Sequence, residues 1–272
     1  MQASVRETLR KNPLITYLII TFAFSWSVFI PLALQKNGVM DFSVPFPIYY
    51  FASFGPLAGA LCTTALLSGT AGLRELFGRM FRWRVGPLWW LVALSPLMLL
   101  GITLIILRIA QGEWFDIGLL GEVEFLPGLG IGALFLWLLT YGLGEETGWR
   151  GFALPLLQKN RSAMKATAIL WIFWACWHAP AFFLVYDPAI LPGFLLGLFA
   201  GAIVFTWLYN STGGSLLMVI VWHGVFNFTT ASKASKAGIL SAVISTLVMF
   251  WAIVVVVKFK TANLSHREKH VL

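Results

Sequence analysis

The chain has 272 residues, of which 59% are hydrophobic and 11% are charged, and its mean hydropathy is +0.83. A soluble domain carries about 25% charged residues, so this composition excludes an ordinary soluble enzyme and predicts a multi-pass membrane protein. The net charge of +8 does not indicate nucleic-acid binding, because Lys and Arg collect in the cytoplasmic loops of membrane proteins. We therefore expect the lipid bilayer, and no nucleic acid, as a partner.

Apolar segments predict an all-α fold, a bundle of about eight transmembrane helices that forms a single membrane domain over residues 1–272. The first segment is too long for a cleavable signal peptide, so we expect it to remain as a span. Cys62 and Cys176 each lie alone in an apolar run, and we expect both to be buried and unpaired. The eight predicted spans cover residues 14–34, 46–67, 88–109, 129–143, 166–185, 189–209, 215–228 and 239–257.

The charges of the connecting segments predict the orientation. Basic clusters occur in the N-terminal tail, in the connections 68–87 and 144–165, and in the C-terminal tail, whereas most acidic residues fall in the alternate connections. Because positive charge accumulates on the cytoplasmic side, we expect both termini in the cytoplasm. Residues 74–85 mix basic and apolar side chains, which fits an interfacial helix and equally an ordinary cytoplasmic connector.

The stretch from residue 141 to residue 151 reads Tyr-Gly-Leu-Gly-Glu-Glu-Thr-Gly-Trp-Arg-Gly. It places Glu145 and Glu146 directly after an apolar segment, near the expected cytoplasmic end of the fourth span. A charge at the bilayer centre costs roughly 2.5–3.5 kcal/mol on insertion scales. Two adjacent carboxylates therefore need partners, a membrane edge or a wet cavity.

Helical spacing predicts different roles for the two carboxylates. Glu146 and Arg150 are four residues apart, so they face one another on a helix. Glu145 is turned away by about 100°, which leaves it without that cation and free to act as a general base.

Two further spans carry polar groups that could complete a site. His223 and Asn227 are four residues apart, so their side chains share one helix face and could hold a developing oxyanion. His178 could converge on the same cavity. Two chemistries remain open: a water activated by Glu145 and His178, or one divalent metal such as zinc bound by Glu145, His178 and His223. No His-Glu-x-x-His motif supports the zinc alternative.

Three motifs, Glu145-Glu146-x-x-x-Arg150, Trp174-x-x-x-His178 and His223-x-x-x-Asn227, resemble those of the CPBP family. This is the CAAX-protease and bacteriocin-processing family, also called Abi, of intramembrane proteases. The motif-bearing core covers residues 129–229. Trp174 departs from the family's more frequent Phe.

The stretch Glu-Glu-Thr-Gly-Trp-Arg-Gly resembles a common bacterial version of the first motif. The resemblance implies an eight-helix endopeptidase in a bacterial plasma membrane, with an active site that opens toward the cytoplasm. Glu145 would be the base and His178 its partner. His223 and Asn227 would lie around the carbonyl, and Glu146 and Arg150 would support the site. Family members are often described as metalloproteases, although a metal-free glutamate-activated water is also proposed.

The leading hypothesis is therefore an intramembrane endopeptidase that cleaves a membrane-associated protein or peptide, of CAAX type or bacteriocin-like, with or without a lipid anchor. Two alternatives use the same polar residues. A proton-coupled transporter would relay protons through the Glu and His side chains. A bacteriocin self-immunity protein would keep the network without catalysis. The identity of the substrate does not follow from the sequence.

Overall fold

The computed structural model describes residues 7, 11–41, 43–112, 114–123, 128–232 and 238–272, and the elements within them are helical. This confirms the all-α fold class. The α-helices are α2 Pro13–Lys36, α3 Gly55–Met80, α4 Pro87–Ala93, α5 Ser95–Gln111, α6 Gly132–Trp137, α7 Glu146–Gly148, α8 Leu154–Gln158, α9 Ala163–Trp177, α10 Leu191–Ser211, α11 Leu216–Thr230 and α12 Ile239–Asn263. Between them lie the 3-10 segments η1 Phe46–Phe54, η2 Ile117–Leu119, η5 Ala179–Phe183 and η6 Pro188–Ile190, and the π-helical segments η3 Leu138–Glu145 and η4 Trp149–Ala153.

Five helical stretches in the described part are long and apolar enough to cross a membrane, and a sixth is added if α4 and α5 form one bent span. The five cover Pro13–Lys36, Phe46–Met80, Ala163–Phe183, Pro188–Ser211 and Ile239–Asn263. The protein is therefore a multi-pass membrane protein. The number eight and the cytoplasmic location of both termini stay predictions.

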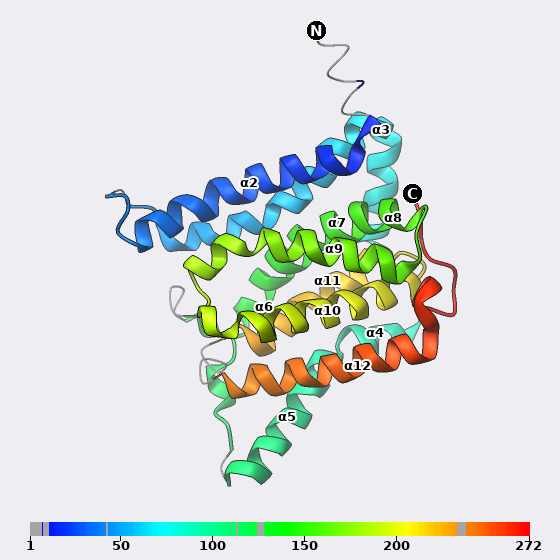
Figure 1. Cartoon of the computed structure of the whole chain (residues 1–272). Helices are drawn as coiled ribbons and strands as arrows, with labels where there is room; N and C mark the ends of the chain where they lie inside the picture. The colour runs from blue at the N-terminus through cyan, green and yellow to red at the C-terminus, as the bar shows by residue number, and fades with distance from the viewer. Residues whose placement is uncertain (1–6, 8–10, 42, 113, 124–127, 233–237) are drawn as a thin grey trace.

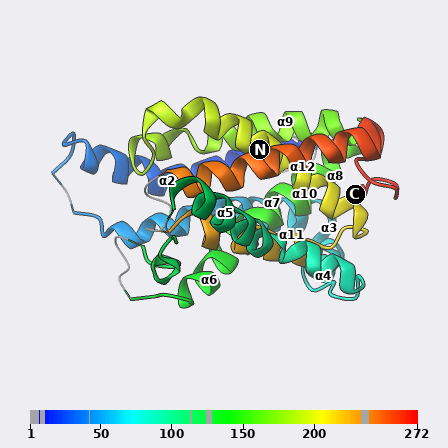
Figure 2. The same cartoon turned by 90° about the horizontal axis from the view of Figure 1, so that it is seen from below.

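The long helices run side by side (Figure 1). α2 packs against α3, and α10 packs between α9 and α12. Seen from below, α9 and α12 lie on one side of the bundle, and α4 and α6 lie on the other (Figure 2). α11 contacts η3 and α6, so the segment with the double glutamate lies against the helix that carries His223.

The helix does not end at residue 143, where the fourth span was predicted to end. Helical winding continues without a gap through α6, η3, α7, η4 and α8 to Gln158. Glu145 therefore lies in the middle of this helical run and not at its end. The apolar run in the sequence ends before Glu145 and Glu146. The helix nevertheless continues, because groups inside the bundle donate hydrogen bonds to both carboxylates.

Two other spans differ from their predicted form. Residues 88–109 form two helices, α4 and α5, bent by 50° relative to each other. α3 continues beyond residue 67 through a break at Gly69, whose φ of 59° is accessible to glycine, and ends at Met80. Most of the predicted interfacial segment 74–85 therefore belongs to α3.

The prediction that both cysteines are buried is wrong. Cys62 and Cys176 are free and exposed on the outer surface of their helices. In a membrane protein the outward face contacts lipid and is itself apolar, so an apolar sequence environment does not distinguish the interior from the lipid-facing surface.

Candidate active site

A cavity of about 40 Å³ lies between α2, η1, η3, the α9–η5 junction and α11. One water needs roughly 10–15 Å³ of such volume, so the cavity has room for water beside polar groups. Four of the six predicted site residues, Glu145, His178, His223 and Asn227, line it. The other lining residues are Phe29, Tyr49, Ser53, Tyr141, Trp177 and Tyr186.

Glu146 and Arg150, the other two predicted residues, lie behind the cavity wall and are fully buried. One carboxylate oxygen of Glu146, Oε1, accepts hydrogen bonds from Arg150 Nη1 at 2.9 Å and from His223 Nδ1 at 2.8 Å. The predicted pairing of Glu146 with Arg150 is confirmed. The contact to His223 was not predicted, because it joins residues 77 positions apart in the chain.

Two aromatic rings cover the Arg150 guanidinium. Its central carbon lies 4.4 Å from the ring centre of Trp174 and 4.5 Å from that of Phe205. Cation–π contacts of this kind contribute about 2 kcal/mol or more when the cation is desolvated. The buried charge is thus held by one carboxylate and two ring faces, which fixes the position of Glu146 and, through it, of His223.

Glu145 has a different partner, as its different orientation predicts. Its Oε2 accepts a hydrogen bond from the indole Nε1 of Trp174 at 2.9 Å, and its side chain lines the cavity. The backbone carbonyl of Trp174 in turn lies 2.7 Å from His178 Nδ1. Because a carbonyl only accepts, Nδ1 carries the hydrogen, and His178 Nε2 is left for the cavity. Trp174 therefore orients both Glu145 and His178.

His223 presents its second ring nitrogen in the same way. Its Nδ1 is occupied by Glu146, which leaves Nε2 toward the cavity. Asn227 lies one turn further along α11, and its Nδ2 donates to the carbonyl of His223 at 3.1 Å. That bond uses one of the two amide hydrogens, so one donor and the amide oxygen remain available.

Two glycines of the 141–151 stretch allow this segment to approach its neighbours closely. A Cβ on Gly142 would lie 2.7 Å from the carbonyl oxygen of Ile220, and a Cβ on Gly144 would lie 2.6 Å from that of Ser53. Both distances are shorter than van der Waals contact. The glycines therefore set the distance of Glu145 from α11 on one side and from η1 on the other.

The aromatic part of the cavity was missed by the sequence analysis. Tyr49 lies in η1, Tyr141 in η3 and Tyr186 in the connection between η5 and η6, so they come together only in the folded chain. Tyr141 was visible within the first motif, but no pattern connected residues 49 or 186 to it.

The possible metal ligands Glu145, His178 and His223 all face the cavity. Within the described residues, however, no three His, Cys, Asp or Glu side chains gather closely enough to hold a metal ion. One oxygen of Glu145 is engaged by Trp174. In this arrangement the described side chains are not gathered into a metal-binding cluster.

The site brings buried Glu and His side chains together with the partly buried Asn227 around a water-sized cavity. Ionisable groups within spans usually mark a functional site. Residues 127–229 match the family model described as Rce1-like, type II CAAX prenyl endopeptidase Rce1-like. The chain is also 29% identical over 152 residues to a protein named CAAX prenyl protease 2 from Methanococcus maripaludis. That alignment covers 50% of this chain and 54% of the relative, so the chain spans about half the length of the relative it matches.

These two comparisons support the resemblance to the CPBP family of CAAX proteases that the three motifs indicate. The matched region contains all six predicted site residues. It coincides closely with the motif-bearing core expected at residues 129–229.

Proposed function

We propose that the protein is an intramembrane endopeptidase in which Glu145 activates a water molecule. The observation that carries the proposal is the position of Glu145: its carboxylate lines a water-sized cavity together with His178 and His223, and Glu146 rather than Glu145 pairs with the buried cation. A carboxylate that is not consumed by an ion pair can accept a proton. The match of residues 127–229 to a family model of type II CAAX prenyl endopeptidases supports the same activity.

The reaction follows from these positions. Glu145 takes a proton from water while His178 Nε2 accepts a hydrogen bond from the same water. The water oxygen attacks the carbonyl carbon of the peptide bond, and the carbonyl oxygen becomes an oxyanion. The free amide hydrogen of Asn227 donates to that oxyanion, and the His223 ring, held by Glu146, lies beside it. Glu145 then returns its proton to the leaving nitrogen, and the products are a carboxylic acid and an amine.

The substrate is a membrane-associated protein or peptide. An apolar groove of about 400 Å³ runs beside the Ala179-Pro180 turn that follows His178, and its walls come from α2 and η5. It would accept an apolar side chain or a lipid chain. A prenylated CAAX-type substrate and an unmodified bacteriocin-like peptide both fit such a surface.

The experiment compares the membrane peptidomes of three cell populations, which make the wild-type protein, the Glu145→Gln variant and the Glu268→Gln variant. Glu268 is an exposed carboxylate in the C-terminal tail and serves as the matched control. Products that appear with wild type and Glu268→Gln, and disappear with Glu145→Gln, support the proposal. Identical peptidomes from wild type and Glu145→Gln would reject it.

A further inference from the structure

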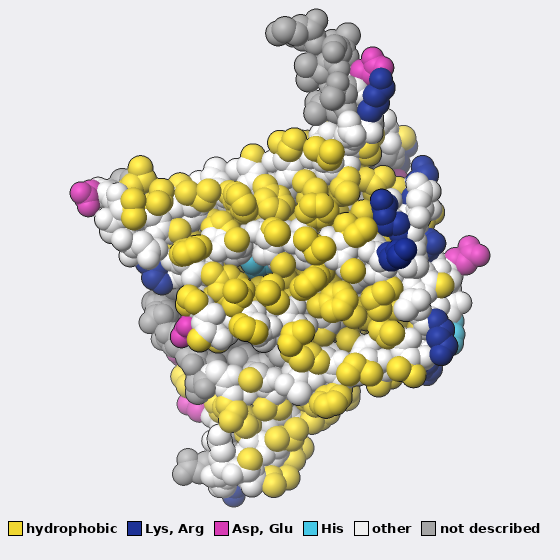
Figure 3. Space-filling view, viewed as in Figure 1, with side chains coloured by type: hydrophobic (Ala, Val, Ile, Leu, Met, Phe, Trp, Pro, Cys, Tyr) yellow, Lys and Arg dark blue, Asp and Glu magenta, His cyan; other side chains and the backbone are white. Residues whose placement is uncertain are grey.

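Positive charge collects at one end of the bundle. In the space-filling view the Lys and Arg side chains gather on the right, where α3, α8 and α12 end and α2 and α9 begin (Figure 3). At the opposite end the described basic residues are Lys36 and Arg108, accompanied by Asp41, Asp116, Glu122 and Asp187. The basic residues at the first end are Lys11, Arg74, Arg79, Arg82, Arg84, Lys159, Arg161, Lys165, Lys258, Lys260, Arg267 and Lys269. The positive-inside rule assigns this basic end to the cytoplasm.

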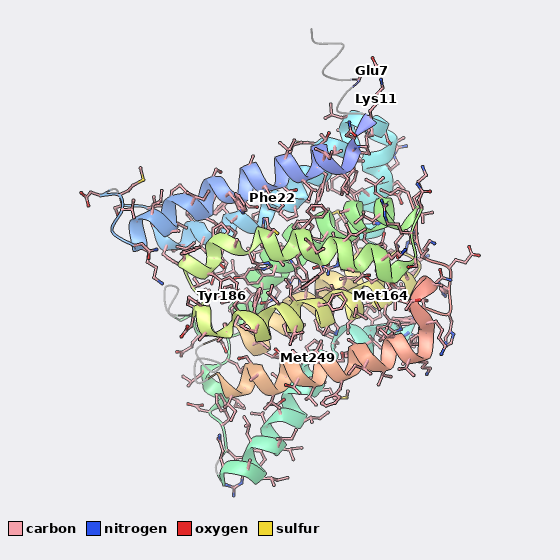
Figure 4. The ribbon with its side chains drawn as sticks, viewed as in Figure 1. Glu7, Lys11, Phe22, Met164, Tyr186 and Met249 are labelled. Atoms are coloured by element: carbon pink, nitrogen blue, oxygen red, sulfur yellow. The ribbon has the colours of Figure 1, made fainter. Side chains whose placement is uncertain are left out.

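The catalytic cavity lies toward the other end. Phe29 belongs to the last turns of α2, Tyr49 to η1, and Tyr186 to the connection before α10. Figure 4 places Tyr186 at the end of the molecule opposite Lys11 and Met164. Each of these lining residues thus comes from the part of its segment that is distant from the basic end.

Buried side chains pack between the cavity and the basic end. Trp149 and Leu154, which follow the double glutamate, are completely buried, as is Tyr209 on α10. Arg79 at the end of α3 is one of them: its Nη1 donates to the carbonyl of Gly151 at 2.8 Å and to the hydroxyl of Tyr209 at 2.6 Å. Water and substrate therefore reach Glu145 from the acidic end.

We propose that the cavity opens on the extracytoplasmic side of the membrane, so that the protein acts on the extracytoplasmic part of a membrane-bound or exported polypeptide. The substrate in this proposal rests on the proposed peptidase function, whereas the side of the membrane on which the cavity opens does not. It replaces the expectation of a cytoplasmic opening, which placed Glu145 at the end of a span that in fact continues to Gln158.

The cavity wall also restricts the substrate. Apart from Glu145, His178 and His223, the lining side chains are aromatic or small and uncharged. A charged residue beside the scissile bond would be desolvated without a partner, which is costly. The cleaved segment is therefore uncharged next to the bond.

Single cysteines test the topology in a background in which Cys62 and Cys176 are replaced by Ala. Ala189→Cys reports on the acidic end, Asn160→Cys on the basic end, and Ser53→Cys on the cavity; positions 160 and 189 are exposed and position 53 lines the cavity. Intact cells that make Ala189→Cys or Asn160→Cys are treated with a membrane-impermeant maleimide. Intact cells that make Ser53→Cys are treated with a small charged methanethiosulfonate. The same variants are treated after permeabilisation.

We expect Ala189→Cys and Ser53→Cys to react in intact cells and Asn160→Cys to react only after permeabilisation. Reaction of Asn160→Cys in intact cells would overturn the orientation. A Ser53→Cys that is unreactive from outside, beside a reactive Ala189→Cys, would overturn the opening. The labelling is repeated in Glu145→Gln, where cleavage is not required, so a failure of the topology is distinguished from a failure of the peptidase function.

Discussion

Trp174 Nε1 donates a hydrogen bond to Glu145 Oε2 at 2.9 Å, while the ring of the same tryptophan lies 4.4 Å from the guanidinium carbon of Arg150. One side chain thus contacts both the carboxylate proposed as the base and the cation that holds its neighbour. The family's more frequent Phe at this position would keep the ring and lose the donor. This departure from the family pattern has a specific structural consequence.

Trp174→Phe should lower kcat with little change in KM, because the ring over Arg150 remains and only the hydrogen bond to Glu145 is lost. A hydrogen bond to a charged group contributes roughly 1.5–3 kcal/mol, which corresponds to a rate decrease of about 10- to 100-fold. Steady-state kinetics on a purified substrate measure the effect. Trp171→Phe is the control, since its Nε1 bonds to the carbonyl of Leu195 outside the cavity. Equal kcat values for wild type and Trp174→Phe would show that the bond does not orient the base.

Glu146→Gln should destabilise the fold by ~3–5 kcal/mol, because it leaves the Arg150 charge buried without its anion. The midpoint of unfolding in detergent measures the loss. Glu7→Gln provides a matched control, since Glu7 pairs with Lys11 at the same four-residue spacing but with both side chains about two-thirds exposed. Such surface pairs contribute 0–1 kcal/mol. A similar small loss for both variants would contradict the structural role given to the Glu146–Arg150 pair.

Gly144→Ala should cost about 1–3 kcal/mol of stability, the usual range for overpacking a close contact. The new methyl group would meet the carbonyl of Ser53, so we also expect η1 and the cavity wall to shift and cleavage to fall. Gly101→Ala on α5 has no neighbouring atom within 4 Å and should be neutral or stabilising by up to about 1 kcal/mol. Thermal unfolding of the two variants side by side gives the comparison, and equal midpoints would argue against the close approach.

Cleavage should continue after stringent chelation, because the three possible ligands are not gathered into a metal-binding cluster within the described residues. The measurement is the rate of the purified protein before and after dialysis against a strong chelator, with elemental analysis of the same sample. Loss of activity that one equivalent of zinc restores would mean that Glu145, His178 and His223 converge further than in this structure.

The sequence predicted the composition of the site better than its surroundings. The spacing of Glu146 and Arg150, and of His223 and Asn227, is a local property of helices, and both pairs lie on shared faces as expected. The bond from His223 to Glu146 joins two separate helices, and no local rule predicts such a contact. The same holds for the tyrosines at 49 and 186, which only the packing of η1 and the α10 connection brings to the cavity.

The predicted fourth span is shorter than the helix because the two charged residues Glu145 and Glu146 were taken to mark its end. The apolar segment ends at residue 143, directly before the double glutamate, yet the helical run continues to Gln158. It continues because Arg150, Trp174 and His223 donate hydrogen bonds to the two carboxylates inside the bundle. A hydropathy scale assigns each charged residue the same unfavourable value, whether or not it has a partner in the folded protein. The double glutamate therefore lies in the middle of its helical run and not at its end.

The central claim is that Glu145 is the general base of peptide hydrolysis, and the most direct measurement is the cleavage rate of purified wild type and Glu145→Gln on one peptide found in the membrane peptidome. A positioned general base contributes roughly 10²- to 10⁴-fold. We predict a loss of at least that size for Glu145→Gln, with an unfolding midpoint equal to that of wild type. Cleavage by Glu145→Gln at the wild-type rate would contradict the account.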